Sequence, residues 1–209
     1  MNHAILLGDA IFDNAAYVPG GQPVATQLRA ALGRDWQVTL LATDGHIAGN
    51  VAGQVAGLPP GATHLVVSVG GNDALAHVSL LDAPSRSFAE SVGRLGELHA
   101  EFRGAYREML SEVLARHLPT AVCTIYDSVP DWPSQAMTVL ASFNDVILRE
   151  AFARRVPVID LRLVCTRSED YSAVSSIEPS AAGGQKIAQA VARLLQEHNF
   201  AANRSAIYW

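Results

Sequence analysis

The chain has 209 residues, of which 49% are hydrophobic and 17% are charged. A chain of this length can bury roughly 70% of its unfolded surface in one core, and this composition excludes an intrinsically disordered protein. The 15 basic and 20 acidic residues give a formal net charge of −5, which leaves no basic footprint for a phosphate backbone. We therefore expect a single domain over residues 1–209 that binds no nucleic acid.

The two cysteines, Cys123 and Cys165, are too few for a disulfide framework or for a four-thiolate zinc site. The N-terminal apolar run ends at Gly8, well short of the hydrophobic region of a signal peptide or of the ~20 residues that span a bilayer. We expect a cytoplasmic protein with no membrane partner. The chain shows no histidine and carboxylate cluster with metal spacing and no Gly-x-Gly-x-x-Gly turn, so we also expect no metal and no cofactor.

Short apolar runs typical of buried strands alternate with longer stretches of helical spacing. The strand-like runs are Ala4–Leu7, Trp36–Leu41, His64–Val69, Ala121–Tyr126 and Val156–Leu161. The helical stretches are Pro23–Leu32, Ile47–Val55, Ser85–His117, Ser134–Arg154 and Gly184–Glu197. Because parallel strands need long, usually helical crossovers, this alternation predicts a five-stranded parallel sheet between two helical layers, a three-layer α/β/α domain.

Four short polar segments occupy the places where such a fold binds ligands. Ligands of open α/β sheets bind beyond the carboxyl ends of the strands. Residues 8–14, 43–46 and 70–73 each follow a predicted strand, and residues 177–180 precede the last helix. We expect these four segments, distant along the chain, to converge on one hollow.

These segments also carry a family resemblance. The run Gly-Asp-Ala-Ile at 8–11 resembles the first block of the SGNH/GDSL hydrolases, Gly-Asp-Ser followed by an apolar residue. The run Gly-Gly-Asn-Asp at 70–73 resembles their Gly-x-Asn-Asp block, and Gly45 stands where they have a second-block glycine. Residues 175–180 resemble their last block, Asp-x-x-His-Pro-Ser. The resemblance covers the chain from the first strand to the last helix and implies a flavodoxin-like fold with strand order 2-1-3-4-5.

Three positions depart from that family pattern. Ala10 stands at the position of the nucleophilic serine, Glu178 at that of the histidine, and Ser175 at that of the aspartate. Alanine has no atom that can attack a carbonyl. Either a serine has been replaced, which would trap a bound ester, or the chain is a natural relative that has lost catalysis and kept its pocket.

The resemblance also implies roles for the remaining positions. The backbone N–H groups of Ala10 and Gly45 and the side chain of Asn72 would form an oxyanion hole. Glycine suits position 45, since no Cβ would obstruct the approach of a substrate to its amide. Substrate contacts are expected from Asp13, Gly71, Tyr126 and Ile177.

The base that would accept the nucleophile's proton is open. Glu178 is one candidate, although a carboxylate starts about 2 pKa units below imidazole and needs burial to close the gap. Arg162 follows the fifth predicted strand and could orient Glu178 or stabilise the oxyanion, because arginine stays protonated. The alternative for Arg162 is a structural ion pair. His46 and His77 flank the site and are further candidates, although histidines in such places are more often structural.

The sequence thus predicts a serine esterase for small acyl esters that is inactive here because of Ala10. The first alternative is a catalytically silent domain that binds an ester or carbohydrate. The second is a flavodoxin-like cofactor binder with a phosphate or flavin at the turn after the first strand. The apolar tail at 201–209 should either pack back on the domain or join two subunits in a homo-oligomer.

Overall fold

The computed structural model describes residues 1–209 and contains one parallel sheet of six strands in the order β2-β1-β3-β4-β5-β6. The strands are β1 (Asn2–Gly8), β2 (Trp36–Leu40), β3 (His64–Ser68), β4 (Thr120–Cys123), β5 (Val158–Ile159) and β6 (Ile207–Tyr208). The first five strands confirm the expected fold class and the order 2-1-3-4-5, and β6 is a strand that was not expected.

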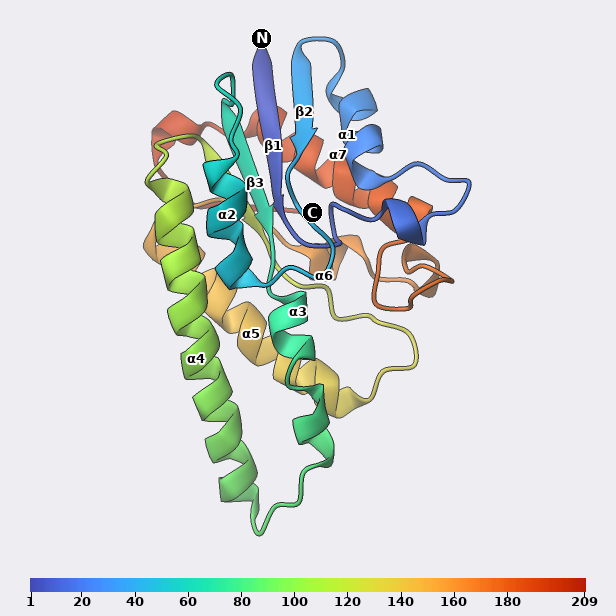
Figure 1. Ribbon diagram of the computed structural model, residues 1–209, viewed down its shortest axis with the longest axis vertical. Coiled ribbons are helices and arrows are strands. Elements are labelled where there is room, and N and C mark those ends of the chain that lie inside the picture. Colours follow the sequence, from blue (N-terminus) through green and yellow to red (C-terminus); the bar gives the residue numbers. More distant parts are fainter.

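Helices cover both faces of this sheet (Figure 1). They are α1 (Val24–Leu32), α2 (Val51–Ala56), α3 (Gly71–Leu75), α4 (Phe88–Leu114), α5 (Ser134–Ala153), α6 (Leu161–Val164) and α7 (Ala181–Glu197). Short 3-10 turns are η1 (Ala15–Tyr17), η2 (Ala48–Asn50), η3 (Val78–Asp82), η4 (Ser168–Asp170) and η5 (Phe200–Ala202). Helices α1, α4, α5 and α7 are where the spacing predicts them, and the stretch predicted over 47–55 divides into the turn η2 and the short helix α2. Helices α3 and α6 are too short to produce a periodic signal.

The core follows from the alternation of side chains along the buried strands. In β1, Ala4 and Leu6 pack in the cluster formed with α1 and α7, while Ile5 and Leu7 pack in the cluster with α2, α4 and α5. All four side chains are fully buried. A strand covered on both faces therefore reads as a continuous apolar run rather than as an alternating one.

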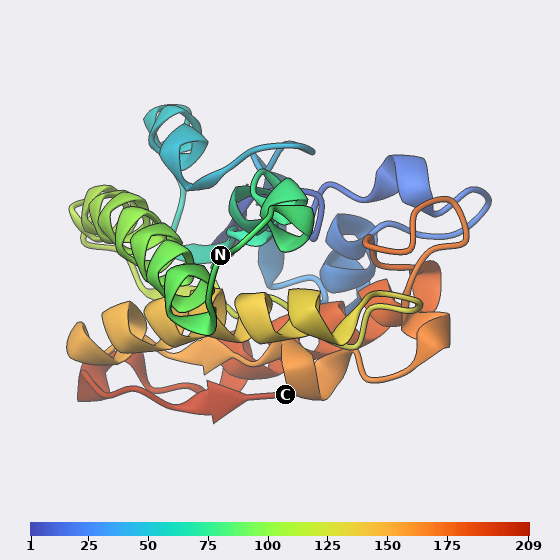
Figure 2. The same cartoon turned by 90° about the horizontal axis from the view of Figure 1, so that it is seen from below.

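Helix α4 is anchored at one end and projects at the other. Its C-terminal half is held to α5 by the buried carboxylate of Glu150, which pairs with Arg103 and Arg107 of α4. Its N-terminal half begins at Ser87, whose side chain accepts the Glu90 N–H. That half extends beyond the carboxyl ends of the strands together with α3 and η3, at the bottom of Figure 1 and toward the viewer in Figure 2.

The C-terminal tail packs back on its own domain. Ile207 and Tyr208 pair in parallel with Val158 and Ile159 of β5, so the tail extends the sheet by one strand. A homo-oligomer formed through this tail stays a prediction. Even the 27-residue α4 lacks the apolar stretch that a bilayer crossing requires, and so does every other helix.

Candidate active site

The turn after β1 places Ala10 at the carboxyl edge of the sheet. Gly8 has φ +119°, and a Cβ there would lie 1.8 Å from the Ser68 carbonyl oxygen, so glycine is required where β1 passes β3. The Ile11 N–H donates to the Asp9 carboxylate at 3.1 Å and closes the turn. Ala10 is buried and lines the large cavity at this edge. Its own backbone N–H donates to no group of the protein.

Gly45 lies in the exposed loop after β2, with φ +79° and open space where a Cβ would be. Its N–H also has no acceptor within the chain. The loop is fixed on either side of it, since Asp44 N–H donates to Asp13 Oδ2 at 3.0 Å and Asn72 Nδ2 donates to the His46 carbonyl at 3.0 Å. Asp13 thus supports this loop, and neither Asp13 nor Gly45 is part of the cavity wall.

Gln54 of α2 is a site residue that the sequence analysis missed. Its buried side-chain amide pairs with both backbone groups of Gly8, accepting the N–H at 2.7 Å and donating to the carbonyl at 2.8 Å. The same Nε2 group donates to His46 Nδ1 at 2.9 Å, which places the imidazole proton on Nε2. Gln54 therefore joins the end of β1 to the loop of Gly45. A lone glutamine in a helix gives no sequence signal for this role.

Gly71 and Asn72 open helix α3 directly after β3, and both line the cavity. The neighbouring Asp73 points away from the cavity and accepts the Ala48 N–H at 3.0 Å. Through Asn72 and Asp73, α3 holds the segment after β2 at His46 and at Ala48. The Asn72 amide uses one N–H in its bond to the His46 carbonyl, and the second N–H has no partner within the chain.

The last block brings Glu178 to the same cavity as Ala10 and Asn72. Three hydrogen bonds to consecutive carbonyl groups hold this segment. Tyr126 Oη donates to the carbonyl of Ile177, Ser172 N–H to that of Glu178, and Asn14 Nδ2 to that of Pro179. Tyr126 and Ile177 both line the cavity. Three of the four segments expected to converge line this cavity, whereas no residue of 43–46 does, so the expected contribution of Gly45 to its wall is not found.

Two carboxyl groups at this end of the cavity hold their protons unusually strongly. Burial, reinforced by the charges of Asp9 and Asp44, raises the pKa of Glu178 to about 8. Burial also raises the pKa of Asp9 to about 7, against the hydrogen bond from Ile11 N–H that lowers it. A carboxyl group with a pKa near 8 matches the proton affinity of a catalytic imidazole, and such a shift in a cavity is typical of functional sites.

Arg162 does not reach Glu178. Its guanidinium forms a two-pronged ion pair with Asp160, with Nε to Oδ1 at 2.8 Å and Nη2 to Oδ2 at 2.7 Å. Thr124 Oγ1 donates to the same carboxylate at 2.9 Å, and Arg162 is absent from the cavity wall. The expected role of Arg162 as a partner of Glu178 or of the oxyanion therefore has no support in this geometry, because the adjacent aspartate binds it first.

The other candidate groups fall outside the reaction centre or are inert. His46 is bound to Gln54 and does not line the cavity, whereas His77 does. Burial raises the pKa of the Cys165 thiol to about 12 and that of Cys123 further, so neither forms a thiolate nucleophile. No three His, Cys, Asp or Glu side chains are grouped to hold a metal ion.

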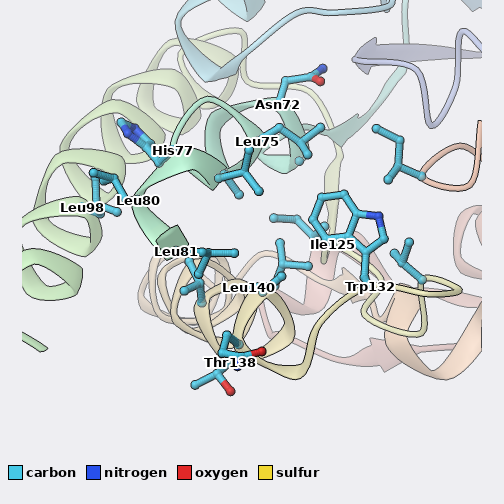
Figure 3. A pocket seen from close by; sticks show the side chains of 18 of the residues that line it. Asn72, Leu75, His77, Leu80, Leu81, Leu98, Ile125, Trp132, Thr138 and Leu140 are labelled. Atoms are coloured by element: carbon cyan, nitrogen blue, oxygen red, sulfur yellow. The ribbon is translucent and has the colours of Figure 1, made fainter. Parts of the chain in front are cut away.

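The cavity itself has a volume of about 460 Å³, and 21 of its 31 lining residues are hydrophobic. Figure 3 shows its apolar side chains, with Asn72 on one side, Trp132 on another, and Leu98 and Leu81 further from the sheet. A cavity of this size fits a small-molecule ligand. The wall combines a polar end at the sheet, with Asp9, Asn72 and Glu178, and a remainder that is mostly apolar.

The sheet order and the placement of residue 10, Asn72 and residue 178 define a protein of the SGNH hydrolase fold. The chain belongs to the GDSL-like Lipase/Acylhydrolase family, which matches residues 6–186. This finding confirms the resemblance drawn from the four sequence blocks and supports an ester hydrolase at the level of the family. Among curated proteins, no sequence matches this chain significantly.

Solved structures confirm the fold at low sequence identity. The lipase Lip_vut3 from a goat rumen metagenome has a TM-score of 0.74 and 15% identity, over 96% of this chain and 100% of its own. The acetyl xylan esterase AlAXEase has a TM-score of 0.65 and 15% identity, over 89% and 96%. Phospholipase A1 from Streptomyces albidoflavus NA297 has a TM-score of 0.63 and 16% identity, over 88% and 94%.

Proposed function

We propose that this site is built to hydrolyse carboxylic esters through an acyl-enzyme and that Ala10 silences the reaction in this chain. The observation that carries the proposal is the shared cavity: Ala10, Asn72 and the buried Glu178 carboxyl all line it. The unpaired N–H of Ala10 supplies a donor at this cavity, whereas the unpaired N–H of Gly45 lies outside its wall. This combination of nucleophile position, base and oxyanion donors is what acyl transfer requires.

With a hydroxyl at position 10, the Glu178 carboxylate takes the hydroxyl proton as the hydroxyl oxygen attacks the ester carbonyl carbon. The resulting oxyanion accepts hydrogen bonds from the Ala10 backbone N–H and the Asn72 amide, the two donors that line the cavity. Collapse of the tetrahedral intermediate expels the alcohol, which takes the proton back from Glu178, and water then repeats the sequence on the acyl group.

A second candidate function is ester binding without turnover. It is favoured by the number of departures from the family pattern, because Ala10, Ser175 and Glu178 all differ while the cavity is intact. A serine replaced only to trap a ligand would leave the other two positions unchanged. In this reading the chain retains the pocket and its donors and holds an acyl ester or carbohydrate ester.

The test is the rate of p-nitrophenyl acetate and butyrate hydrolysis by wild-type protein and by Ala10→Ser. We expect the wild-type rate to equal that of a matched protein control, and the Ala10→Ser rate to exceed it and to rise with pH through about 8 as Glu178 ionises. Ala10→Ser/Glu178→Gln should lose this activity, whereas Ala10→Ser/Arg162→Gln should keep it. An Ala10→Ser protein that is folded and no faster than wild type overturns the esterase proposal and leaves the binding function.

A further inference from the structure

The cavity continues well beyond the groups that the proposed reaction uses. From Ala10 and Asn72 it runs between η3, the first turns of α4 and the start of α5, and we call this portion the distal arm. Its wall includes Leu80, Leu81, Phe88, Val92, Leu98 and Val139. Figure 3 shows Leu80, Leu81 and Leu98 gathered on the side of the cavity away from Trp132. None of these residues has a part in binding a small acyl group at the sheet edge.

The N-terminal half of α4 is not packed on the core. The first buried residue of this helix is Phe102, although the helix begins at Phe88. Phe88 is 85% exposed and Val92 is 48% exposed, while Leu95 and Leu98 are half-buried. Apolar side chains left in water in this way favour any apolar ligand that would cover them. All four of these side chains line the cavity.

The charge distribution along the cavity is one-sided. Asp9 and Glu178 lie at the sheet end with Asn72. The only arginine that lines the distal arm, Arg94, forms an ion pair with Glu90 at 2.7 Å and donates a hydrogen bond to the Pro84 carbonyl at 3.0 Å. The rest of the arm has no lysine or carboxylate, and its other polar side chains are His77, Ser91, Gln135 and Thr138. The ligand that fits best has one polar end at the sheet and an apolar chain.

We propose that the distal arm binds the chain of a long-chain acyl ester, so that the ligand class of this protein is a single-chain lipid ester. The proposal rests on the proposed function for the placement of the ester carbonyl near Ala10 and Asn72. An acyl chain is the expected ligand of the arm because one cavity joins the donor groups near Ala10 and Asn72 to the apolar wall of η3, α4 and α5. The proposed ligand therefore has a long acyl chain, whereas the sequence predicted a small acyl group.

The absence of a nucleophile makes the wild-type protein suitable for the test, since intact esters can be titrated at equilibrium. Monoacylglycerols of four, six, eight, ten and twelve acyl carbons, each below its micelle concentration, are titrated into wild-type protein by calorimetry. We expect the affinity to rise about fourfold per methylene group until the arm is filled. The heat capacity of binding should become more negative along the series. A twelve-carbon ester that binds no tighter than a four-carbon ester overturns the proposal.

Two variants show whether the distal arm is the place of binding. Leu98→Gln puts an amide into the arm, and Ala100→Gln puts the same amide on the exposed side of α4, outside the cavity wall. Leu98→Gln should weaken twelve-carbon binding at least tenfold and leave four-carbon binding unchanged, while Ala100→Gln changes neither. Both should unfold at temperatures close to wild type, because neither site is in the core. Equal effects of the two substitutions on the long ester contradict the proposal.

The result also separates this inference from the proposed function. If Ala10→Ser hydrolyses butyrate while wild-type affinity does not depend on chain length, the reaction stands and the distal arm is not an acyl site. If affinity rises with chain length and Leu98→Gln abolishes the rise while Ala10→Ser is inert, the arm binds lipid chains and the esterase proposal fails.

Discussion

The Tyr126 hydroxyl donates a hydrogen bond to the carbonyl oxygen of Ile177, the residue immediately before Glu178. Tyr126 follows β4, and Tyr171 packs edge-on against its ring with centroids 5.0 Å apart. This contact ties the last block of the chain to the middle of the sheet. The position of the Glu178 carboxyl therefore depends on a side chain more than fifty residues away in sequence.

Removal of this hydroxyl should loosen the last block. Tyr126→Phe leaves the Ile177 carbonyl without its donor, so we expect a loss of about 1–2 kcal/mol in the free energy of unfolding. In the Ala10→Ser background it should lower kcat more than it raises KM and alter the pH profile. Tyr208→Phe, which removes a hydroxyl near His198 at the far edge of the sheet, is the matched control and should leave the pH profile unchanged.

The raised pKa of Glu178 predicts a specific loss of stability with pH. Its carboxyl has a pKa of about 8 in the folded protein and an ordinary value of 4.5 when unfolded. The folded state thus keeps a proton that the unfolded chain releases. The resulting stability is complete below pH 4.5 and is lost as the pH rises to 8.

Unfolding by urea from pH 5 to 9 measures this effect. Glu178→Gln should flatten the decline in stability over this interval, because glutamine resembles the protonated acid and does not titrate. Glu108→Gln, on the exposed surface of α4, should reproduce the wild-type pH dependence. A Glu178→Gln protein with the full wild-type decline would assign it to another group, of which Asp9 is the first candidate.

The two hydrogen bonds between the Gln54 side chain and Gly8 predict that a residue outside the cavity has a large effect on stability. Gln54→Ala removes the partner of the buried Gly8 N–H and one partner of its carbonyl, so we expect a loss of about 2–4 kcal/mol on chemical unfolding. Gln185→Ala, on the exposed face of α7, should change stability by less than about 0.5 kcal/mol. Similar losses of stability from the two substitutions would contradict this role of Gln54.

A close backbone contact fixes the start of α7 against the segment before the last block. A Cβ at Gly183 would lie 2.1 Å from the Asp170 carbonyl oxygen, whereas a Cβ at Gly104 of α4 would meet nothing within 4 Å. Gly183→Ala should therefore destabilise the protein by more than about 3 kcal/mol or prevent folding. Gly104→Ala should stabilise it by up to about 1 kcal/mol, because alanine is the better helix former. The melting temperatures of the two variants test this prediction, and equal melting temperatures would contradict it.

Much of the fold could be predicted because the central strands are buried on both faces and read as unbroken apolar runs. The prediction failed at the edge of the sheet and at the end of β5. β6 has two residues, and Leu161, which ends an apolar run, begins α6 because the Asp160 side chain accepts the Arg162 N–H. A run of apolar residues does not distinguish a buried strand end from a buried helix start.

The site could be predicted where it depends on motifs that follow strands and not where it depends on side-chain partners. Ala10, Asn72 and Glu178 meet because strand order fixes where their segments lie. The choice of Asp160 rather than Glu178 as the partner of Arg162 depends on the local turn, which the sequence pattern does not specify. The distal arm depends on the half of α4 that leaves the core, and its spacing looks the same as that of the packed half.

The central claim is that residue 10 faces a carbonyl-sized space between oxyanion donors and a basic carboxyl. Intact-mass spectrometry after incubation with a p-nitrophenyl alkylphosphonate tests it most directly, since the phosphonyl group mimics the tetrahedral intermediate. Ala10→Ser should gain one phosphonyl group, wild-type protein none, and Ala10→Ser/Asn72→Ala should react about 10²–10³ times more slowly. An Ala10→Ser protein that is folded and acquires no adduct would contradict the account.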